Sequence, residues 1–247
     1  MIQRFSVFIL IVFLAYACSP NNVKNDPNIV KILDSAKVSG SFALMENGSG
    51  QFTITNLSLY KDSSYAPLNT FFAVPALLGL DKGYIKHDTS NWVSLDSVNY
   101  YNAIIEKLGR ATILKTIDSL HYGKGIVSND LNNFWKDGSL RITADEQLGF
   151  IKKLYFGQLS FQKRAQDIFK KMILKEDNAS YQLSYIIGSD QASKPSFWLV
   201  GYVEENKHPY FFVMHLEAKN NNQFNDVNAV SLLKTILLQQ GFLKGVR

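Results

Sequence analysis

The sequence has little of several features that define common protein classes. A single cysteine in 247 residues excludes an intramolecular disulfide. The chain contains no run of five or six basic residues, which disfavours nucleic acid as a partner. Proline (6 residues) and glycine (15) are sparse, which excludes a collagen-like or low-complexity chain. With 46% hydrophobic residues and a net charge of +5, the chain has ample apolar surface to bury. We therefore expect a folded protein that does not bind nucleic acid.

Only one long apolar run occurs, near Met1, which excludes a membrane protein with several spans. Arg4 precedes an apolar stretch over 5–15 that is short for a transmembrane helix, and small residues lead up to Cys18. This arrangement resembles the signal of bacterial lipoproteins, although Ala15 stands where that signal commonly has leucine. An ordinary secretory signal or an uncleaved anchor is the alternative. The resemblance implies a bacterial cell-envelope protein held to a membrane by lipidated Cys18.

The segment boundaries follow from this interpretation. Residues 1–17 are the predicted signal peptide, and residues 18–37 are the predicted tether to the lipid. The tether is expected because 19–30 are polar and interrupted by prolines. No second linker or repeat follows, so residues 38–247 are predicted to form one domain.

Hydrophobic periodicity predicts a mixed fold for that domain. Two strands come first, then an all-helical stretch, then three strands and a last helix. The expected strands are 39–45, 51–56, 181–187, 196–204 and 210–217, and the expected helices are 70–80, 98–108, 111–120, 143–155, 161–174 and 225–240. Thr143 and Glu146 have the spacing of a capping box. The predicted class is α/β (α+β), an antiparallel sheet flanked by helices with an all-helical subregion.

Motifs of common cofactor and catalytic sites are missing. The four histidines lack zinc-site spacing, and neither a Gly-rich phosphate loop nor a Gly-x-Ser-x-Gly elbow occurs, so no metal or cofactor is expected. Two Ser-x-x-Lys strings begin at Ser160 and Ser231, about as many as chance gives. We interpret Ser160 as a helix N-cap, Ser231 as an exposed helical residue, and His215 as a packed or solvated strand residue.

A series of short blocks follows a fixed order along the chain. Residues 67–72 read Pro-Leu-Asn-Thr-Phe-Phe, and Leu-Gly-Leu follows at 78–80. Further blocks are Asp96-Ser97-Val98, Tyr122-Gly123-Lys124, residues 133–143 around Trp135, residues 159–166 and residues 198–204. In order and spacing these blocks resemble those of class D β-lactamases and related penicillin-binding sensor domains. The resemblance covers about residues 38–243 and implies a β-lactamase/transpeptidase-like fold.

The differences from that family fall on the positions that carry its chemistry. By the resemblance, Asn69 stands at the position of the nucleophilic serine, and an amide cannot be activated to attack a carbonyl. Phe72 stands at the position of the lysine that becomes carboxylated and acts as general base. Asp96 stands at the serine of the family's Ser-x-Val motif, unless the register slips by one to Ser97.

The substrate-holding positions differ as well. Ile186-Ile187-Gly188 replaces the family's Lys-Thr-Gly, and no arginine lies between Arg164 and Arg247 to hold a substrate carboxylate. We predict that Phe72 points toward Trp135, and that the two isoleucines make the neighbouring strand apolar. The former cleft would then be lined by Thr70, Val98, Trp135 and Ile187, with Gly188 and Gly201 kept as scaffold.

These differences support three hypotheses. The leading one is a lipid-anchored pseudoenzyme that binds a cell-wall peptide, a β-lactam or a protein partner at the former cleft. The reason is that a serine hydrolase without its nucleophile and base keeps a rate enhancement of only about 10³–10⁴ over the reaction in water. The alternative is a divergent enzyme that acylates or hydrolyses β-lactams through an unrecognised nucleophile: Thr70, Ser97, or Ser64 with Lys61. The third is a structural lipoprotein with no ligand at the cleft.

Overall fold

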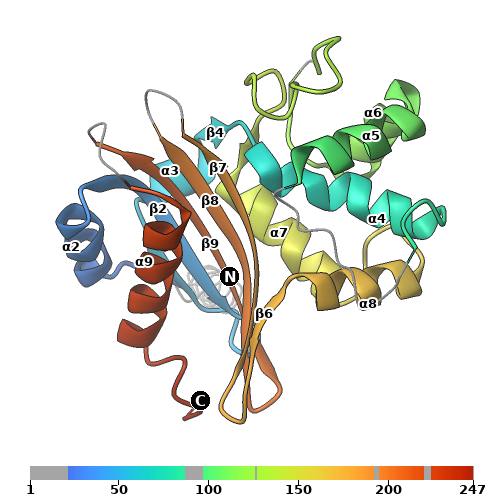
Figure 1. Cartoon of the computed structure of the whole chain (residues 1–247). Helices are drawn as coiled ribbons and strands as arrows, with labels where there is room; N and C mark the ends of the chain where they lie inside the picture. The colour runs from blue at the N-terminus through green and yellow to red at the C-terminus, as the bar shows by residue number, and fades with distance from the viewer. Residues whose placement is uncertain (1–21, 87–96, 126, 192–194, 220–223, 247) are drawn as a thin grey trace, which may run out of the picture.

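A seven-stranded sheet runs through the molecule (Figure 1). The structure, a computed structural model, describes residues 22–86, 97–125, 127–191, 195–219 and 224–246. Strand order is β1-β3-β2-β9-β8-β7-β6; only β1 and β3 pair in parallel among these neighbours. The strands are β1 (Val23–Lys24), β2 (Val38–Glu46), β3 (Phe52–Thr55), β6 (Leu174–Asp177), β7 (Gln182–Asp190), β8 (Ser196–Glu205) and β9 (His208–Ala218). A separate two-stranded sheet joins β4 (Ser64–Tyr65) to β5 (Ile142–Thr143).

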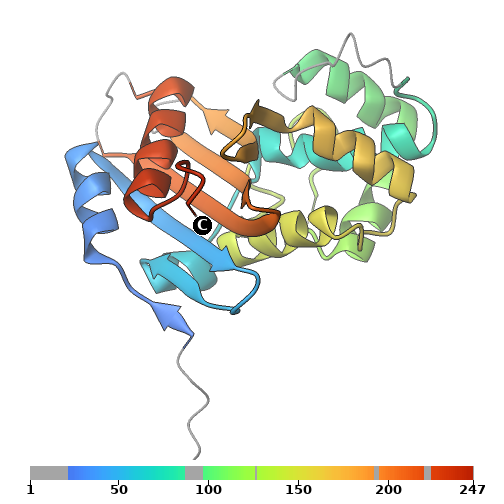
Figure 2. The same cartoon turned by 90° about the horizontal axis from the view of Figure 1, so that it is seen from below.

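Helices cover both faces of the large sheet (Figures 1 and 2). One face carries α2 (Pro27–Ser35) and α9 (Asp226–Gln239). The other carries α3 (Leu57–Lys61), α4 (Ala73–Asp81), α5 (Val98–Leu108), α6 (Arg110–Leu120), α7 (Ala144–Tyr155) and α8 (Lys163–Met172). Strand β8 serves both cores, because Trp198 faces the larger helical layer and Phe197 faces α2 and α9. The predicted fold class is therefore confirmed.

The centre of the helical layer is α4, which is buried on nearly every side. A short 3₁₀ helix, η1 (Leu68–Phe72), leads into it, so the predicted helix over 70–80 begins as 3₁₀ and becomes α-helical only at Ala73. Pro75 is accommodated because it lies in the first turn of α4, where its missing N–H would have no helical partner. An apolar helix without a polar face can only be stable at such a buried position.

The predicted capping box at the start of α7 is confirmed. Thr143 Oγ1 accepts a hydrogen bond from the Glu146 N–H (3.1 Å), and the Glu146 carboxylate accepts one from the Thr143 N–H (2.9 Å). These two bonds satisfy amides that the first helical turn leaves without partners. The cap fixes where α7 begins, and thereby places Gln147, one residue further on, against η1.

The predicted tether is wrong from Val23 onwards. Strand β1 pairs with β3, and α2 packs Ile29 and Leu33 into the core beneath α9. The prolines and asparagines that suggested a linker are helix-start signals instead: Asp26 caps Asn28 N–H (2.9 Å), and Pro27 occupies the first helical position. The folded domain thus includes residues that were assigned to the tether.

Other boundaries differ by less. Gln162, and not Ser160, is the N-cap of α8, and the chain enters β6 at Leu174, where the prediction still had helix. The predicted signal peptide, Cys18 and Asp96 lie outside the described residues. Within the described ranges, no helix combines the length and apolar character needed to cross a bilayer.

Candidate functional site

The site of interest lies where η1 meets β7. Leu68, the residue before Asn69, has a φ of 54°, a left-handed conformation that is uncommon for a side chain of this size. Its N–H donates to the Trp135 carbonyl (3.0 Å), which holds the turn in place. Backbone strain of this kind persists only where surrounding contacts determine it, and it is concentrated at functional sites. Asn69, which is half-buried, therefore directly follows a residue that surrounding contacts hold in a left-handed conformation.

Gly188 on β7 allows the close approach of the strand to this turn. A Cβ atom added at Gly188 would lie 2.8 Å from the Thr70 backbone nitrogen and 3.0 Å from that of Asn69. Both are backbone atoms, which cannot move aside as the end of a side chain can. Gly188 thus brings the strand against the backbone amides of the Asn69 turn.

Thr70 is the centre of a buried hydrogen-bonded group. Its hydroxyl donates to the Pro67 carbonyl and accepts from Gln147 Nε2 (2.7 Å). Tyr122, also fully buried, donates to Gln147 Oε1 at 3.5 Å, and burial raises the pKa of its hydroxyl. The Thr70 hydroxyl is therefore engaged as donor and as acceptor, and no basic group takes its proton.

Phe72 is completely buried between two aromatic rings. Its ring lies 4.7 Å from that of Trp135 and 5.1 Å from that of Tyr101 on α5, with which it stacks. The predicted orientation toward Trp135 is confirmed, and Tyr101 is an additional partner that the sequence did not indicate. The Trp135 indole N–H is buried and finds no acceptor in the part of the chain that the structure describes. The apolar ring next to it offers none.

Only one of the two isoleucines of β7 faces the site. Ile186 is buried in the core that contains Phe72, on the same face as Gly188. Ile187 packs against the opposite core, under α9, because successive side chains of a strand point to opposite faces. The prediction that Ile187 lines the cleft is therefore wrong. Val98, half-buried at the start of α5, does pack against the core on the site's side.

The remaining candidate nucleophiles have other partners or positions. Ser64 accepts from Arg141 Nε (3.3 Å), and Lys61 is exposed at the end of α3. Ser97 is half-buried before α5 and makes no side-chain cap bond there. In the two Ser-x-x-Lys strings, the lysines pair with carboxylates: Lys163 with Asp167, and Lys234 with Glu176 (2.5 Å).

A second polar cluster beside the site was not predicted. His215 on β9 is buried, stacks on Tyr65 (3.7 Å between ring centres) and lies 3.1 Å through Nε2 from Ser196 Oγ. Trp198 contacts His215 and donates to the Ala66 carbonyl (2.9 Å), which ties β8 to the segment before η1. His215 is thus a packed residue, as expected. The pairing across β8 and β9 that assembles this cluster cannot be read from sequence spacing.

Among the residues that the structure describes, no three His, Cys, Asp or Glu side chains gather in a way that could hold a metal ion. The site at η1 combines a strained turn, closely approaching backbone amides, an amide side chain at position 69 and an aromatic ring at position 72. The side chains at positions 69 and 72 supply neither a nucleophile nor a base.

Comparison with known proteins identifies proteins with this architecture. No protein-family model matches the chain. "Beta-lactamase OXA-48" of Klebsiella pneumoniae is 27% identical over 216 residues, covering 78% of this chain and 81% of that protein. The C-terminal domain of the Bacillus licheniformis BlaR penicillin-receptor has a TM-score of 0.79 at 23% identity and covers 91% of this chain and 98% of its own. A class D β-lactamase from Sebaldella termitidis also has a TM-score of 0.79, at 22% identity, covering 90% and 98%.

The fold is therefore that of class D β-lactamases and penicillin-receptor domains, and the sequence is similar to proteins of both kinds. This agrees with the resemblance noted from the short sequence blocks.

Proposed function

We propose that this protein is a lipid-anchored pseudoenzyme of the penicillin-binding fold, which acts by binding and forms no acyl bond. The observation that carries the proposal is the pair of substitutions at η1. Asn69 occupies the turn where the resemblance places the nucleophile, and Phe72 fills the position of the base between Tyr101 and Trp135.

Acyl transfer requires a nucleophile and a nearby group that accepts its proton. The Asn69 amide is not a nucleophile, and the Phe72 ring cannot take up a proton. Thr70, the nearest hydroxyl in the chain, donates its proton to the Pro67 carbonyl instead. Binding, by contrast, needs only a shaped turn and a strand beside it, and this chain has both.

The proposed ligand follows from what the similar proteins are named for. BlaR is a penicillin receptor, and OXA-48 is a β-lactamase. At the site where η1 meets β7 we accordingly propose that the ligand is a β-lactam, a cell-wall peptide of related shape, or a protein partner. Ile186, in place of a cation, disfavours ligands that depend on a carboxylate ion pair at this strand.

The anchor is proposed from the N-terminal sequence. Two acyl chains on Cys18 would give stable attachment to a membrane of the bacterial envelope. Incorporation of labelled fatty acid into the wild-type chain, and its loss in Cys18→Ser, is the expected result. Equal labelling of the two chains would contradict lipidation at this residue.

Intact-protein mass spectrometry tests the catalytic part of the proposal. After incubation with several β-lactams, the wild-type chain should show no adduct, whereas an active class D β-lactamase treated in parallel should. A stoichiometric adduct on the wild-type chain would overturn the proposal and, once mapped, identify the nucleophile of an active divergent enzyme.

Variants test whether positions 69 and 72 are the cause. Asn69→Ser combined with Phe72→Lys, given bicarbonate to carboxylate the lysine, should regain slow acylation. The matched control, Asn69→Ala with Phe72→Lys, has the base without the nucleophile and should remain free of adduct. Titration calorimetry of the wild-type chain with a β-lactam and with a cell-wall peptide then measures non-covalent binding.

A further inference from the structure

The domain holds the chain from Asn22 onwards, four positions after Cys18 in the sequence. The Phe52 N–H donates to the Asn22 carbonyl (2.7 Å), and Val23 pairs with Phe52 as β1 begins. Asp26 then caps α2 and accepts hydrogen bonds from Gln239 (3.2 Å) and Gln240 (2.7 Å) at the end of α9. The chain is thus held to the domain by both the sheet and a helix from residue 22 onwards.

Only three residues separate this fixed point from the cysteine. Ser19, Pro20 and Asn21 lie between Cys18 and Asn22, and four residue steps of extended chain reach at most about 14 Å. The headgroup layer of one leaflet is itself roughly 5–8 Å thick. If Cys18 carries lipid, little chain is left over, and Asn22 must lie within several ångström of the membrane surface.

We infer that the β1–β3 edge of the sheet, together with α3, rests on the lipid bilayer that anchors the chain. This inference rests on the lipid anchor proposed above and extends it to an orientation. The edge consists of β1, β3, the turn 47–51 and α3, which follows β3 directly and lies beside it in Figure 2.

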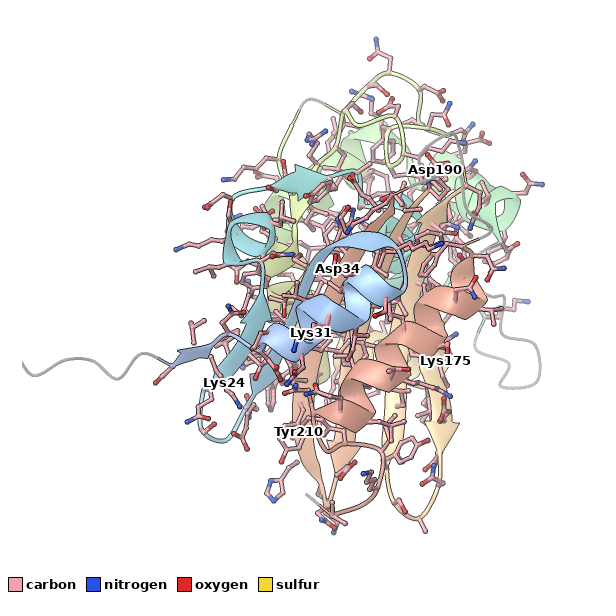
Figure 3. All side chains as sticks on the ribbon, turned by 90° about the vertical axis from the view of Figure 1, so that its left-hand side faces the viewer. Lys24, Lys31, Asp34, Lys175, Asp190 and Tyr210 are labelled. Carbon is pink, nitrogen blue, oxygen red and sulfur yellow. The ribbon has the colours of Figure 1, made fainter. Side chains whose placement is uncertain are left out.

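The surface chemistry of this edge suits a lipid headgroup layer. Val23 and Leu57 expose 37% and 51% of their surface there, and Lys24 and Lys61 are exposed beside them. Long lysine side chains over apolar ones match a layer with anionic headgroups above acyl chains. Figure 3 shows Lys24 at the end of β1 and Lys31 on the neighbouring α2, with Asp190 at the distant end of the sheet.

The orientation decides whether the site where η1 meets β7 faces the membrane or the aqueous phase. From β1 to β7 the sheet order counts five inter-strand spacings of about 4.8 Å, or roughly 24 Å. Asn69 and Gly188 therefore lie well outside the headgroup layer when the β1–β3 edge is on the membrane. A partner at this site must be reached from the aqueous side, as a soluble molecule or a strand of cell wall, and cannot be a lipid-embedded one.

Thiol labelling of the full chain tests this orientation. A lipidated Cys18 has no free thiol, so a second cysteine becomes the only reactive one. We choose Lys61→Cys on the edge and Lys115→Cys on α6, which lies on the far side of the molecule in Figures 1 and 2. Both lysines are exposed, which makes them a matched pair.

Each full-length variant is produced with its own leader and reconstituted into vesicles of phosphatidylethanolamine with a minority of phosphatidylglycerol. A bulky membrane-impermeant maleimide should label Lys61→Cys about tenfold more slowly in vesicles than in detergent, because the bilayer blocks its approach. Labelling of Lys115→Cys should be equal in both. Inserting about twenty Gly/Ser residues after Pro20, a coil of roughly 25 Å, should abolish the difference.

The outcomes separate the two proposals. If Cys18 carries no lipid, the anchor fails and the orientation fails with it. If Cys18 is lipidated and both cysteines label alike in vesicles, the anchor stands and the orientation is overturned. Protection of Lys115→Cys alone would likewise contradict the proposed orientation. Protection of Lys61→Cys that persists after the Gly/Ser insertion would show that the short segment between Cys18 and Asn22 is not its cause.

Discussion

The two sides of Asn69 differ in character. On one side, Thr70, Gln147 and Tyr122 form a buried polar group in which the Thr70 hydroxyl is satisfied as donor and acceptor. On the other, Phe72 fills an aromatic group with Tyr101 and Trp135, and the Trp135 N–H has no acceptor among the described residues. We call these the polar side and the aromatic side of the site.

The difference teaches that the two sides of the turn place different demands on their side chains. A buried hydrogen-bonded group resists change, because removing one member leaves its partners unsatisfied. Position 72 has a weaker requirement, since any apolar side chain that fills the space restores packing. The turn can therefore keep its shape while the side chain at position 72 changes.

The largest effect is expected on the aromatic side. Phe72→Ala removes a completely buried ring and should lower the free energy of unfolding by about 3–5 kcal/mol. Phe72→Leu, which fills most of the space, should lose clearly less. Urea denaturation at neutral pH measures both. A loss below about 1 kcal/mol for the alanine variant would show that this side is not closely packed.

The polar side should respond to loss of a hydroxyl at nearly constant volume. Thr70→Val leaves the Gln147 amide and the Pro67 carbonyl without their partner and should cost about 1–3 kcal/mol. Thr70→Ser keeps the hydroxyl and is the matched control, expected to retain most of the stability. A larger loss in Thr70→Ser than in Thr70→Val would assign the effect to the methyl group and not to the hydrogen bonds.

Both sides depend on the approach of β7. Gly188→Ala forces a Cβ against the backbone nitrogens of Thr70 and Asn69 and should cost about 1–3 kcal/mol. The control is Gly48→Ala, where the added atom meets nothing within 4 Å, and a change within about 0.5 kcal/mol is expected. If the two variants have the same denaturation midpoint, the strand does not press on the turn.

The smallest effect concerns Asp26, a reference outside the site. Burial alone raises the pKa of Asp26, but hydrogen bonds from Asn28, Gln240 and Gln239 outweigh it and leave the pKa below its usual 3.8. The carboxylate therefore stabilises the fold above the unfolded pKa, and this contribution is lost as pH falls through the folded value. Asp26→Asn, which keeps a capping side chain, should cost about 1 kcal/mol at pH 7.

The same comparison at acid pH tests whether the charge of Asp26 causes the stabilisation. Below the folded pKa of Asp26, wild type and Asp26→Asn should differ little in urea denaturation, because both then carry an uncharged side chain. A difference that is unchanged between pH 7 and strong acid would assign the stabilisation to something other than the charge.

Local sequence signals predicted those parts of the molecule whose causes are local. The capping box of α7, the hairpin of β2 and β3 and the strands β7 to β9 follow from residues close in sequence, and the structure contains them. The N-terminal segment was mispredicted because Asp26-Pro27-Asn28 fits both a linker and a helix start. Only Ile29 and Leu33, one turn apart, distinguish the two.

The sequence by itself determined the mixed fold, the blocks that resemble class D β-lactamases, and the absence of serine and lysine at positions 69 and 72, since residue identity and short-range periodicity need no contacts to be read. Only the tertiary structure decided that Thr70 is occupied by Pro67 and Gln147, that Tyr101 stacks on Phe72, and that Ile187 faces away from the site. The physical reason is that these contacts join segments far apart in the chain, through strand pairing and helix packing that local patterns do not specify.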